Sequence, residues 1–121
     1  MSKPAQHQTC GLSAALAVIH GKWKATILWM LHAEPLRFGE LRRRVGGISE
    51  KVLFEQLREL EAEGLVHRED AGENPPRVEY SLTESGLELN IAVHALSEWG
   101  TRHVRKRDEP AAFSWAAPQV S

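Results

Sequence analysis

Hydrophobic residues near the N-terminus recur at helical spacing. Leu12, Leu16 and Ile19 stand at i, i+4 and i+7, which is typical of one face of a short amphipathic helix. Ser13 belongs to the residue types that cap helices at their start, and Gly21 belongs to those that follow a helix end. We therefore expect a first helix between Ser13 and Gly21.

Two further helices are predicted before residue 46. The second is marked by apolar residues on one face, namely Trp23, Ile27, Met30 and Leu31, and Pro35 prevents it from continuing. A third, very short helix is marked by Phe38, Leu41 and Val45. The pair Gly46-Gly47 ends this helix, because glycine readily adopts the backbone angles found after a helix C-terminus.

A fourth helix is predicted over residues 49–63. Ser49 is a favoured N-cap residue, and Gly64 stands where a left-handed residue commonly follows a helix. The apolar stripe between them is formed by Leu53, Leu57 and Leu60. The borders of this helix are therefore the clearest in the chain.

A β-hairpin and a long helix are predicted after Gly64. Residues 65–82 contain a short run of β type, a tip rich in Gly and Pro, and then apolar residues that alternate with polar ones. Thr83 caps a helix that continues to about residue 107. This helix carries two apolar stripes, one formed by Leu87, Ile91, Ala95 and Trp99, the other by Leu89, Val93 and Leu96. It therefore needs two partners to pack against.

The order of these elements predicts an α+β, mostly helical fold. Three helices, a glycine-containing turn, a capped helix, a hairpin and a long terminal helix follow one another as in a winged helix-turn-helix with a terminal dimerisation helix. The domain is expected to span residues 10–109, with the recognition helix at 49–63, the wing at 65–82 and the dimerisation helix at 83–107. Residues 1–9 are expected to form a flexible arm and residues 110–121 a flexible tail.

The exposed side of the predicted recognition helix carries groups that can read base edges in a major groove. The candidates for base reading are Ser49, Glu50, Lys51, Phe54, Glu55 and Arg58. The candidates for contact with the DNA backbone, one of them at the wing, are Arg37, Arg42, Arg43, Arg44 and Arg77. The alternative interpretation is a solvated helix face with ion pairs of a few tenths of a kcal/mol each.

Charge is distributed unevenly along the chain. The total of 15 Lys and Arg against 16 Asp and Glu in 121 residues gives a net charge of -1, which alone argues against a nucleic-acid partner. Residues 37–58, however, hold six basic and three acidic groups (+3), whereas residues 59–82 hold two and seven (-5). The basic excess thus lies on the segment predicted to face DNA, and the acidic hairpin leaves open a role as a protein-interaction module.

Other classes of protein are disfavoured by the sequence. No nucleophile stands with a matching base, so we expect no enzyme and no cofactor. His94, Glu98 and His103 have a spacing that does not bring all three to one metal site, so no metal is expected either. Without a long apolar run or a secretory signal, the chain is predicted to be cytoplasmic, with no membrane contact.

Seven runs in the chain form an ordered set of short motifs: CGL at 10–12, GKWK at 21–24, RFGELR at 37–42, GISEKVL at 47–53, LRELEAEGLV at 57–66, PRVEYSLT at 76–83 and EWG at 98–100. In this order they resemble the HxlR-type family of bacterial transcriptional regulators. The resemblance implies a winged helix-turn-helix related to MarR-type regulators. It further implies a homodimer, built from the N- and C-terminal helices, that binds a pseudo-palindromic DNA operator without an enzymatic step. We expect such a regulator to act as a repressor.

The resemblance also bears on the subunit interface and on the single cysteine. The interface candidates are Leu12, Leu16, Leu89, Val93, Leu96 and Trp99. Some relatives carry a cysteine at the position of Cys10 that senses oxidants or electrophiles, whereas the alternative is an unreactive residue at the start of a helix. An inducer is therefore expected to be a small molecule or an electrophile. With one cysteine per chain, a protein disulfide must join two subunits.

Overall fold

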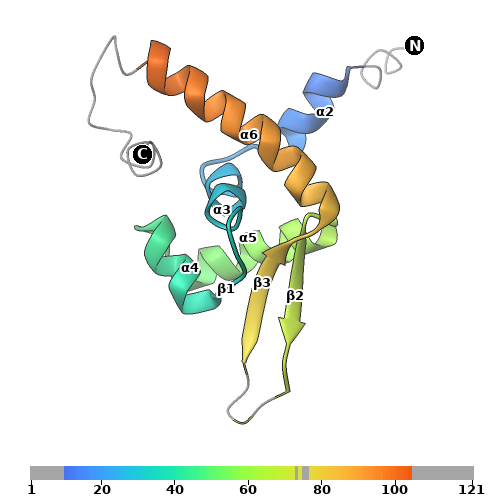
Figure 1. Cartoon of the computed structure of the whole chain (residues 1–121), viewed down its shortest axis with the longest axis vertical. Helices are drawn as coiled ribbons and strands as arrows, with labels where there is room; N and C mark the ends of the chain where they lie inside the picture. Colours follow the sequence, from blue (N-terminus) through green and yellow to red (C-terminus); the bar gives the residue numbers. More distant parts are fainter. Residues whose placement is uncertain (1–9, 73, 75–76, 105–121) are drawn as a thin grey trace.

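The computed structural model describes residues 10–72, 74 and 77–104 and has the predicted fold class (Figure 1). The predicted arm at 1–9 and tail at 110–121, like the predicted last helical residues at 105–107, lie outside the described residues. The elements in chain order are α2 (Gly11–Val18), α3 (Lys24–Met30), β1 (Leu36–Arg37), α4 (Phe38–Val45), α5 (Glu50–Ala62), β2 (Val66–Asp70), β3 (Val78–Leu82) and α6 (Glu84–His103).

The hairpin belongs to a three-stranded antiparallel sheet in the order β1-β3-β2. Val66 of β2 pairs with Leu82 of β3, as the predicted hairpin requires. Leu36 of β1 pairs with Tyr80 on the other side of β3. Strand β1 was not predicted, because a strand of two residues is too short to show alternation.

Three of the helix starts show how the local sequence sets the elements. The Ser49 hydroxyl accepts a hydrogen bond from the Val52 N–H at 3.1 Å, and the Thr83 hydroxyl accepts one from the Gly86 N–H at 3.0 Å. Both N-caps were predicted. The predicted cap of the first helix was wrong, because α2 is capped by Cys10, whose Sγ accepts from the Ser13 N–H at 3.3 Å.

The hydrophobic core lies between α3, α4, α5 and the sheet. It contains the predicted stripe of α5 and the inner faces of the neighbouring elements, and its fully buried large side chains are Ile27, Leu28, Leu36, Leu41, Leu53, Leu57 and Leu60. Burial of the α5 stripe turns the opposite side of that helix toward solvent. The core therefore fixes which face of α5 a ligand can reach.

The long helix α6 covers the end of the molecule opposite the hairpin tip (Figure 1). Its buried positions are Gly86, Asn90, Val93 and Ser97, and it approaches the wing so closely that a Cβ on Gly86 would lie 2.2 Å from the Leu65 carbonyl oxygen. The large apolar residues Leu87, Ile91, Leu96 and Trp99 are exposed instead. The predicted stripe of Leu87, Ile91, Ala95 and Trp99 is thus one exposed face, whereas the second predicted stripe is divided, with Val93 buried and Leu96 exposed.

The short helix α2 has no buried residue. Leu12 and Leu16 are exposed on it, and α2 lies at the same end of the molecule as α6 (Figure 1). Among the described residues, no helix is both long enough and apolar enough to cross a bilayer.

Candidate nucleic-acid interface

The solvent side of α5 carries most of the residues predicted to read bases. Lys51, Phe54, Glu55 and Arg58 are all exposed, and Phe54 retains 46% of its accessible surface. The Lys51 ammonium lies 3.4 Å from the Glu55 carboxylate, and the Arg58 guanidinium lies 5.6 Å from the centre of the Phe54 ring. The face therefore presents a cation, an anion and a half-exposed aromatic ring, held in two neighbouring pairs.

The turn between α4 and α5 is built on Gly46 and Gly47, which both have positive φ angles, 76° and 75°. A non-glycine residue would be strained at either position. A shallow hollow of about 610 Å³ lies along this turn, lined by Arg42, Arg43, Gly46, Gly47, Ile48 and Ser49. The hollow thus combines two guanidinium groups with backbone that no side chain covers, which suits contact with a phosphate.

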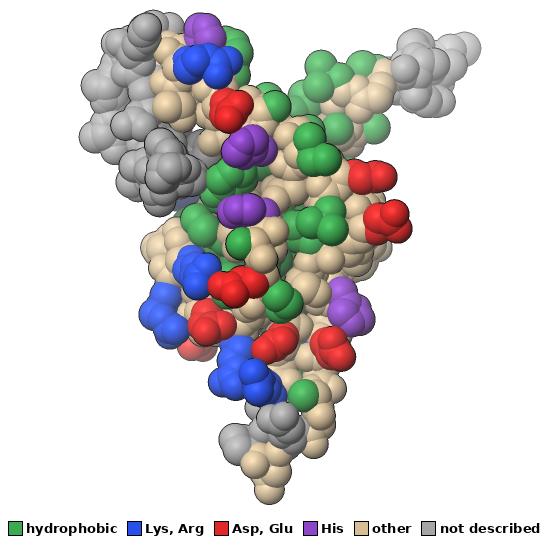
Figure 2. Space-filling model, viewed as in Figure 1, with side chains coloured by type: hydrophobic (Ala, Val, Ile, Leu, Met, Phe, Trp, Pro, Cys, Tyr) green, Lys and Arg blue, Asp and Glu red, His purple; other side chains and the backbone are tan. Residues whose placement is uncertain are grey.

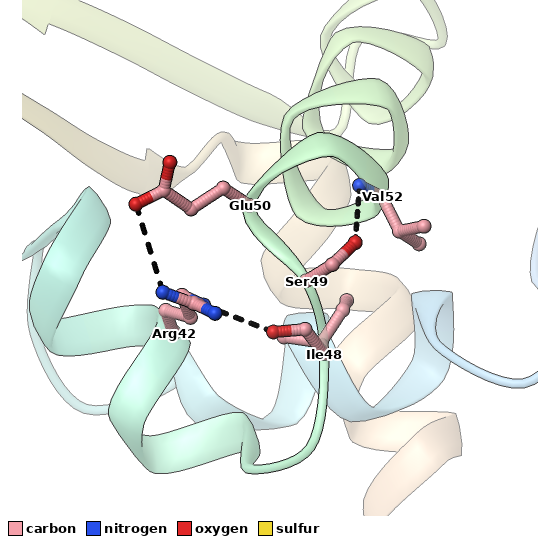
Figure 3. Close-up of polar contacts among 5 residues, drawn as sticks. All are labelled: Arg42, Ile48, Ser49, Glu50 and Val52. Carbon is pink, nitrogen blue, oxygen red and sulfur yellow. Dashed lines mark hydrogen bonds and ion pairs between the residues drawn. The ribbon is translucent and has the colours of Figure 1, made fainter.

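Arg42 crosses this turn and contacts both sides of it (Figure 3). Its Nε donates a hydrogen bond to the Ile48 carbonyl at 2.9 Å, and its Nη1 lies 3.6 Å from a carboxylate oxygen of Glu50. Ile48 is buried in the core, so its carbonyl is a fixed acceptor. Arg42 therefore connects α4 to the first turn of α5.

The other arginines predicted to contact the DNA backbone have different surroundings. Arg44 lies 3.6 Å from Glu34, and Arg77, at the start of β3, lies 3.3 Å from Glu79. Arg37 and Arg43 are exposed, and within the described part of the chain neither side chain has an ion-pair partner. Pro75 and Pro76, which precede Arg77 in the sequence, lie outside the described residues.

Glu40 adds a fixed negative charge to this basic segment. Its carboxylate accepts a hydrogen bond from the backbone N–H of Arg37 at 3.0 Å. This bond, helped by the charges of the nearby arginines, lowers the pKa of the Glu40 carboxyl from its ordinary value. Glu40 therefore stays ionised and reduces the net positive charge of the α4 surface.

A buried lysine holds the back of α5. The side chain of Lys24 is only 7% exposed, and its ammonium pairs with the carboxylate of Glu59. The pairing lowers the pKa of the Glu59 carboxyl, chiefly through the hydrogen bond from Lys24. Sequence reasoning missed this pair, although a lysine three and four residues before Ile27 and Leu28, on the buried face of α3, was the signal that could have shown it.

Apolar side chains gather at the other end of the molecule. In Figure 2 they lie over α2 and α6, whereas charged side chains of both signs cover the part of the same face toward the wing. Of the predicted interface residues, Leu12, Leu16, Leu96 and Trp99 are exposed, and Leu89 is half-buried. Val93 is only 5% exposed and packs inside its own subunit, so its prediction as an interface residue was wrong.

Cys10 lies at this apolar end, at the start of α2. Its side chain is exposed, and the hydrogen bond from the Ser13 N–H lowers the pKa of the thiol from its ordinary value. The start of α2 therefore favours the thiolate of Cys10. The described residues also contain no group of three His, Cys, Asp or Glu side chains able to hold a metal ion.

The three-stranded sheet, the capped helix behind the glycine turn and the long terminal helix define a winged helix-turn-helix protein. The family model of the HxlR-like helix-turn-helix matches residues 18–108, and the chain belongs to this family. A relative from Halalkalibacterium halodurans, described as an uncharacterised HTH-type transcriptional regulator, is 46% identical over 89 residues, which are 73% of this chain and 79% of the relative. The chain is accordingly a transcriptional regulator with a helix-turn-helix, from a family of regulators and not of enzymes.

Two solved structures are similar over most of the chain. The redox regulator HypR in its reduced form is 42% identical, with a TM-score of 0.75, and the match covers 82% of this chain and 100% of HypR. The reduced form of the transcriptional regulator YodB from Bacillus subtilis is 30% identical, with a TM-score of 0.71, and the match covers 89% of this chain and 100% of YodB.

Proposed function

We propose that the protein is a sequence-specific DNA-binding repressor that acts in the cytoplasm as a homodimer on a pseudo-palindromic operator. The observation that carries the proposal is the outer face of α5, which is exposed along its length while the core fixes the opposite face. A helix presented in this way fits the major groove. Two such helices, one from each subunit, would enter successive major grooves about 10 bp apart.

The base-reading residues are the exposed groups of the first three turns of this helix. Lys51 and Arg58 can donate to guanine, and Glu55 can accept from the amino group of cytosine. Phe54 keeps enough exposed ring to contact a thymine methyl group. Ser49 and Glu50 complete the set at the N-terminal end of α5.

Among the arginines around the turn and at the wing, the phosphate-binding residues are Arg37, Arg43, Arg44 and Arg77. Arg43 suits this role best, because it lines the hollow at the turn and no ion pair within the described residues competes for it. Arg37 is similarly exposed, whereas Arg44 and Arg77 would have to share their charge with Glu34 and Glu79. Because most arginines around the turn and at the wing lie beside a carboxylate, we expect weak binding to non-specific DNA.

A test of this division compares Lys51→Ala with Arg43→Ala in gel-shift titrations. Lys51→Ala should change the preferred sequence, while Arg43→Ala should weaken binding to all sequences alike and reduce the salt dependence by about one counterion. Identical effects of the two substitutions would contradict the assignment of reading and positioning roles.

The second copy in the proposed dimer covers the apolar faces of α2 and α6. Leu12, Ile91 and Leu96 keep 67%, 72% and 56% of their surface in the isolated chain, which is unusual for large apolar side chains that remain in water. A second, shallow hollow of about 430 Å³ lies between α2 and α6 and has room for a small-molecule inducer. Its lining includes Ala15, Glu63, Glu88 and Leu89.

A second candidate function is control of DNA binding through Cys10. It is favoured by the exposed thiol with its lowered pKa and by the similarity to HypR, which is described as a redox regulator. Two Cys10 thiols, one from each subunit, would lose two protons and two electrons to an oxidant such as diamide, which becomes the hydrazine, and form one disulfide between subunits.

The test compares operator affinity of the native protein and of Cys10→Ser before and after diamide treatment. Serine keeps the N-cap of α2, so the substitution removes the thiol without removing the cap. Diamide should change the affinity of the native dimer and leave the variant unaffected. Equal responses of the two proteins would exclude Cys10 from regulation.

A further inference from the structure

We propose that Arg42 is a positioning residue and not a phosphate contact, and that it orients Glu50 to select a base with an exocyclic amino group. This inference rests on the proposed DNA-binding function and specifies how one position of the operator is recognised. It starts from the two contacts that Arg42 makes across the turn, to the Ile48 carbonyl and to the Glu50 carboxylate (Figure 3).

The first contact anchors the arginine. Its Nε donates to the carbonyl of Ile48, a residue that is only 4% exposed and belongs to the core. The planar guanidinium has a rigid fork of donors, so fixing Nε also restricts the direction of its remaining nitrogens. The turn that it spans contains two glycines, which have the largest backbone freedom to lose on folding. Arg42 thus ties the start of α5 to α4 at the most easily deformed point of the motif.

The second contact places Glu50. The carboxylate stands in the first turn of α5, where the helix dipole favours a negative charge, and it lies 3.6 Å from Nη1 of Arg42. The side chain of Glu50 is 75% exposed, so the ion pair leaves acceptor sites open to solvent. Partial neutralisation by Arg42 also reduces the repulsion between this carboxylate and DNA phosphates.

The chemistry of an ionised carboxylate determines what it can bind in a major groove. It accepts hydrogen bonds and cannot donate them. Cytosine presents its N4 amino group and adenine its N6 amino group, whereas guanine and thymine present the acceptors O6, N7 and O4. Glu50 is therefore expected to require cytosine or adenine at the base that faces it, once in each half-site.

Neighbouring Arg43 provides a matched control. It lies on the same helix, is exposed and lines the same hollow, but no ion pair within the described residues holds it. Arg42→Gln and Arg43→Gln remove the same charge at adjacent positions. Any difference between the two variants therefore reports the contacts of Arg42 and not the net charge of the protein.

The experiment selects bound duplexes from a random-sequence DNA library with the full-length protein, Arg42→Gln, Arg42→Lys, Arg43→Gln and Glu50→Gln. The affinity of each protein for the selected and for the random duplexes is then measured between about 50 and 200 mM salt. In this range each phosphate contact adds to the salt dependence of the affinity. Urea unfolding of each variant checks that it is folded.

We expect Arg43→Gln to weaken both affinities alike and to lower the salt dependence by about one counterion. Arg42→Gln should keep the salt dependence but lower the ratio of selected to random affinity about tenfold, with base preference lost at one position per half-site. Arg42→Lys, which keeps the charge but lacks the rigid fork of the guanidinium, should recover part of that ratio. Glu50→Gln should shift the same position toward adenine, because an amide can pair with adenine at both N6 and N7.

Two results would overturn the inference while leaving the proposed function intact. One is an equal loss of salt dependence in Arg42→Gln and Arg43→Gln, which would make Arg42 a phosphate contact. The other is the absence of any half-site position that the native protein restricts to cytosine or adenine and at which Arg42→Gln loses that preference. Failure of the native protein to select any sequence would instead contradict the proposed function itself, and the inference with it.

Discussion

At the scale of single residues, the back of α5 depends on a charged pair. Lys24 is buried and Glu59 is largely exposed, so the pair combines a desolvated cation with a carboxylate that water still reaches. Burial of an unpaired ammonium is costly, and the hydrogen bond to Glu59 offsets that cost. Because Glu59 lies on α5 and Lys24 on α3, the pair holds the helix that we propose reads DNA against its support.

The lowered pKa of Glu59 predicts a specific pH dependence of stability. A carboxyl whose pKa is lower in the folded state stabilises the fold fully above its ordinary pKa, near 4.3, and loses this contribution as the pH falls through the lower folded value. Glu59→Gln should therefore be less stable than the native protein at pH 7, and the difference should shrink toward pH 3. Urea unfolding at a series of pH values measures it.

Glu63→Gln is the control for this series. Glu63 is also an exposed glutamate at the end of α5, but the described residues offer it no ion-pair partner. We expect its substitution to leave the pH dependence of the native protein unchanged. A Glu59→Gln variant with the native pH profile would show that Lys24 does not stabilise the ionised carboxylate.

The sequence predicted most local features at this scale, the cap of α2 excepted, but not the long-range contacts. The N-caps of Ser49 and Thr83 and the positive φ of Gly64 depend on the neighbouring residues, so these residue types were sufficient to place the helix borders. The Lys24–Glu59 pair joins residues 35 positions apart, which no local pattern can reveal. Cys10 was not recognised as a cap because sulfur is a weak acceptor and is seldom found in that role.

At the scale of elements, α6 differs most from its predicted form. Its inner face contains the small or polar residues Gly86, Asn90 and Ser97, and its most apolar face is exposed. Periodicity locates the apolar face of a helix but cannot say whether that face meets its own subunit or another one. The sequence therefore placed α6 correctly but put Val93, which packs inside its own subunit, among the interface residues.

Two glycines of α6 give opposite predictions for the same substitution. Gly86→Ala should destabilise the protein by about 1 to 3 kcal/mol or more, because the new Cβ would lie 2.2 Å from the Leu65 carbonyl oxygen. Gly100→Ala meets no atom within 4 Å and should stabilise the helix by up to about 1 kcal/mol. Thermal or urea unfolding of the two variants measures the difference. Equal effects would mean that α6 does not pack on the wing as described.

A stack of rings connects α3 to α6. The ring of Trp29, which is 7% exposed, lies 4.7 Å from that of His32 and 4.9 Å from that of His94, and His94 also lies 3.2 Å from Glu98. His94→Ala should reduce stability by about 0.5 to 1.5 kcal/mol, since it removes the ring contact with Trp29. Urea unfolding followed by tryptophan fluorescence measures the change.

His103→Ala is the control for the stack. His103 lies 4.7 Å from the ring of Trp99, but Trp99 is 54% exposed and lies on the same helix. Its substitution should change stability by less than about 0.5 kcal/mol. A loss of stability as large as that of His94→Ala would show that the ring stack does not hold α3 to α6.

At the scale of the whole molecule, the two ends differ in chemistry. Exposed apolar residues are concentrated on α2 and α6, whereas the end that carries α4, α5 and the wing is charged (Figures 1 and 2). A net charge of -1 conceals this division, because the acidic segment 59–82 offsets the basic segment 37–58. One end is thus suited to a second subunit and the other to DNA.

Substitution of one exposed apolar residue at each end separates these functions. Ile91→Glu, at a position that is 72% exposed, should convert the dimer to a folded monomer because a charge cannot be buried at the interface without a partner. Phe54→Glu, at a position that is 46% exposed, should leave the dimer intact and abolish sequence selection. Sedimentation velocity gives the oligomeric state. A monomeric Phe54→Glu or a dimeric Ile91→Glu would contradict the assignment of one end to the second subunit and the other to DNA.

The most direct test of the central claim is a DNase footprint of the full-length protein on the intergenic DNA that flanks its gene. We expect one protected site with two half-sites centred about 10 bp apart and occupied by two chains. Lys51→Ala should change the sequence that the protein prefers. Protection should disappear as salt rises. Absence of a protected site at protein concentrations that leave random competitor DNA unbound would contradict the assignment of α5 as a recognition helix.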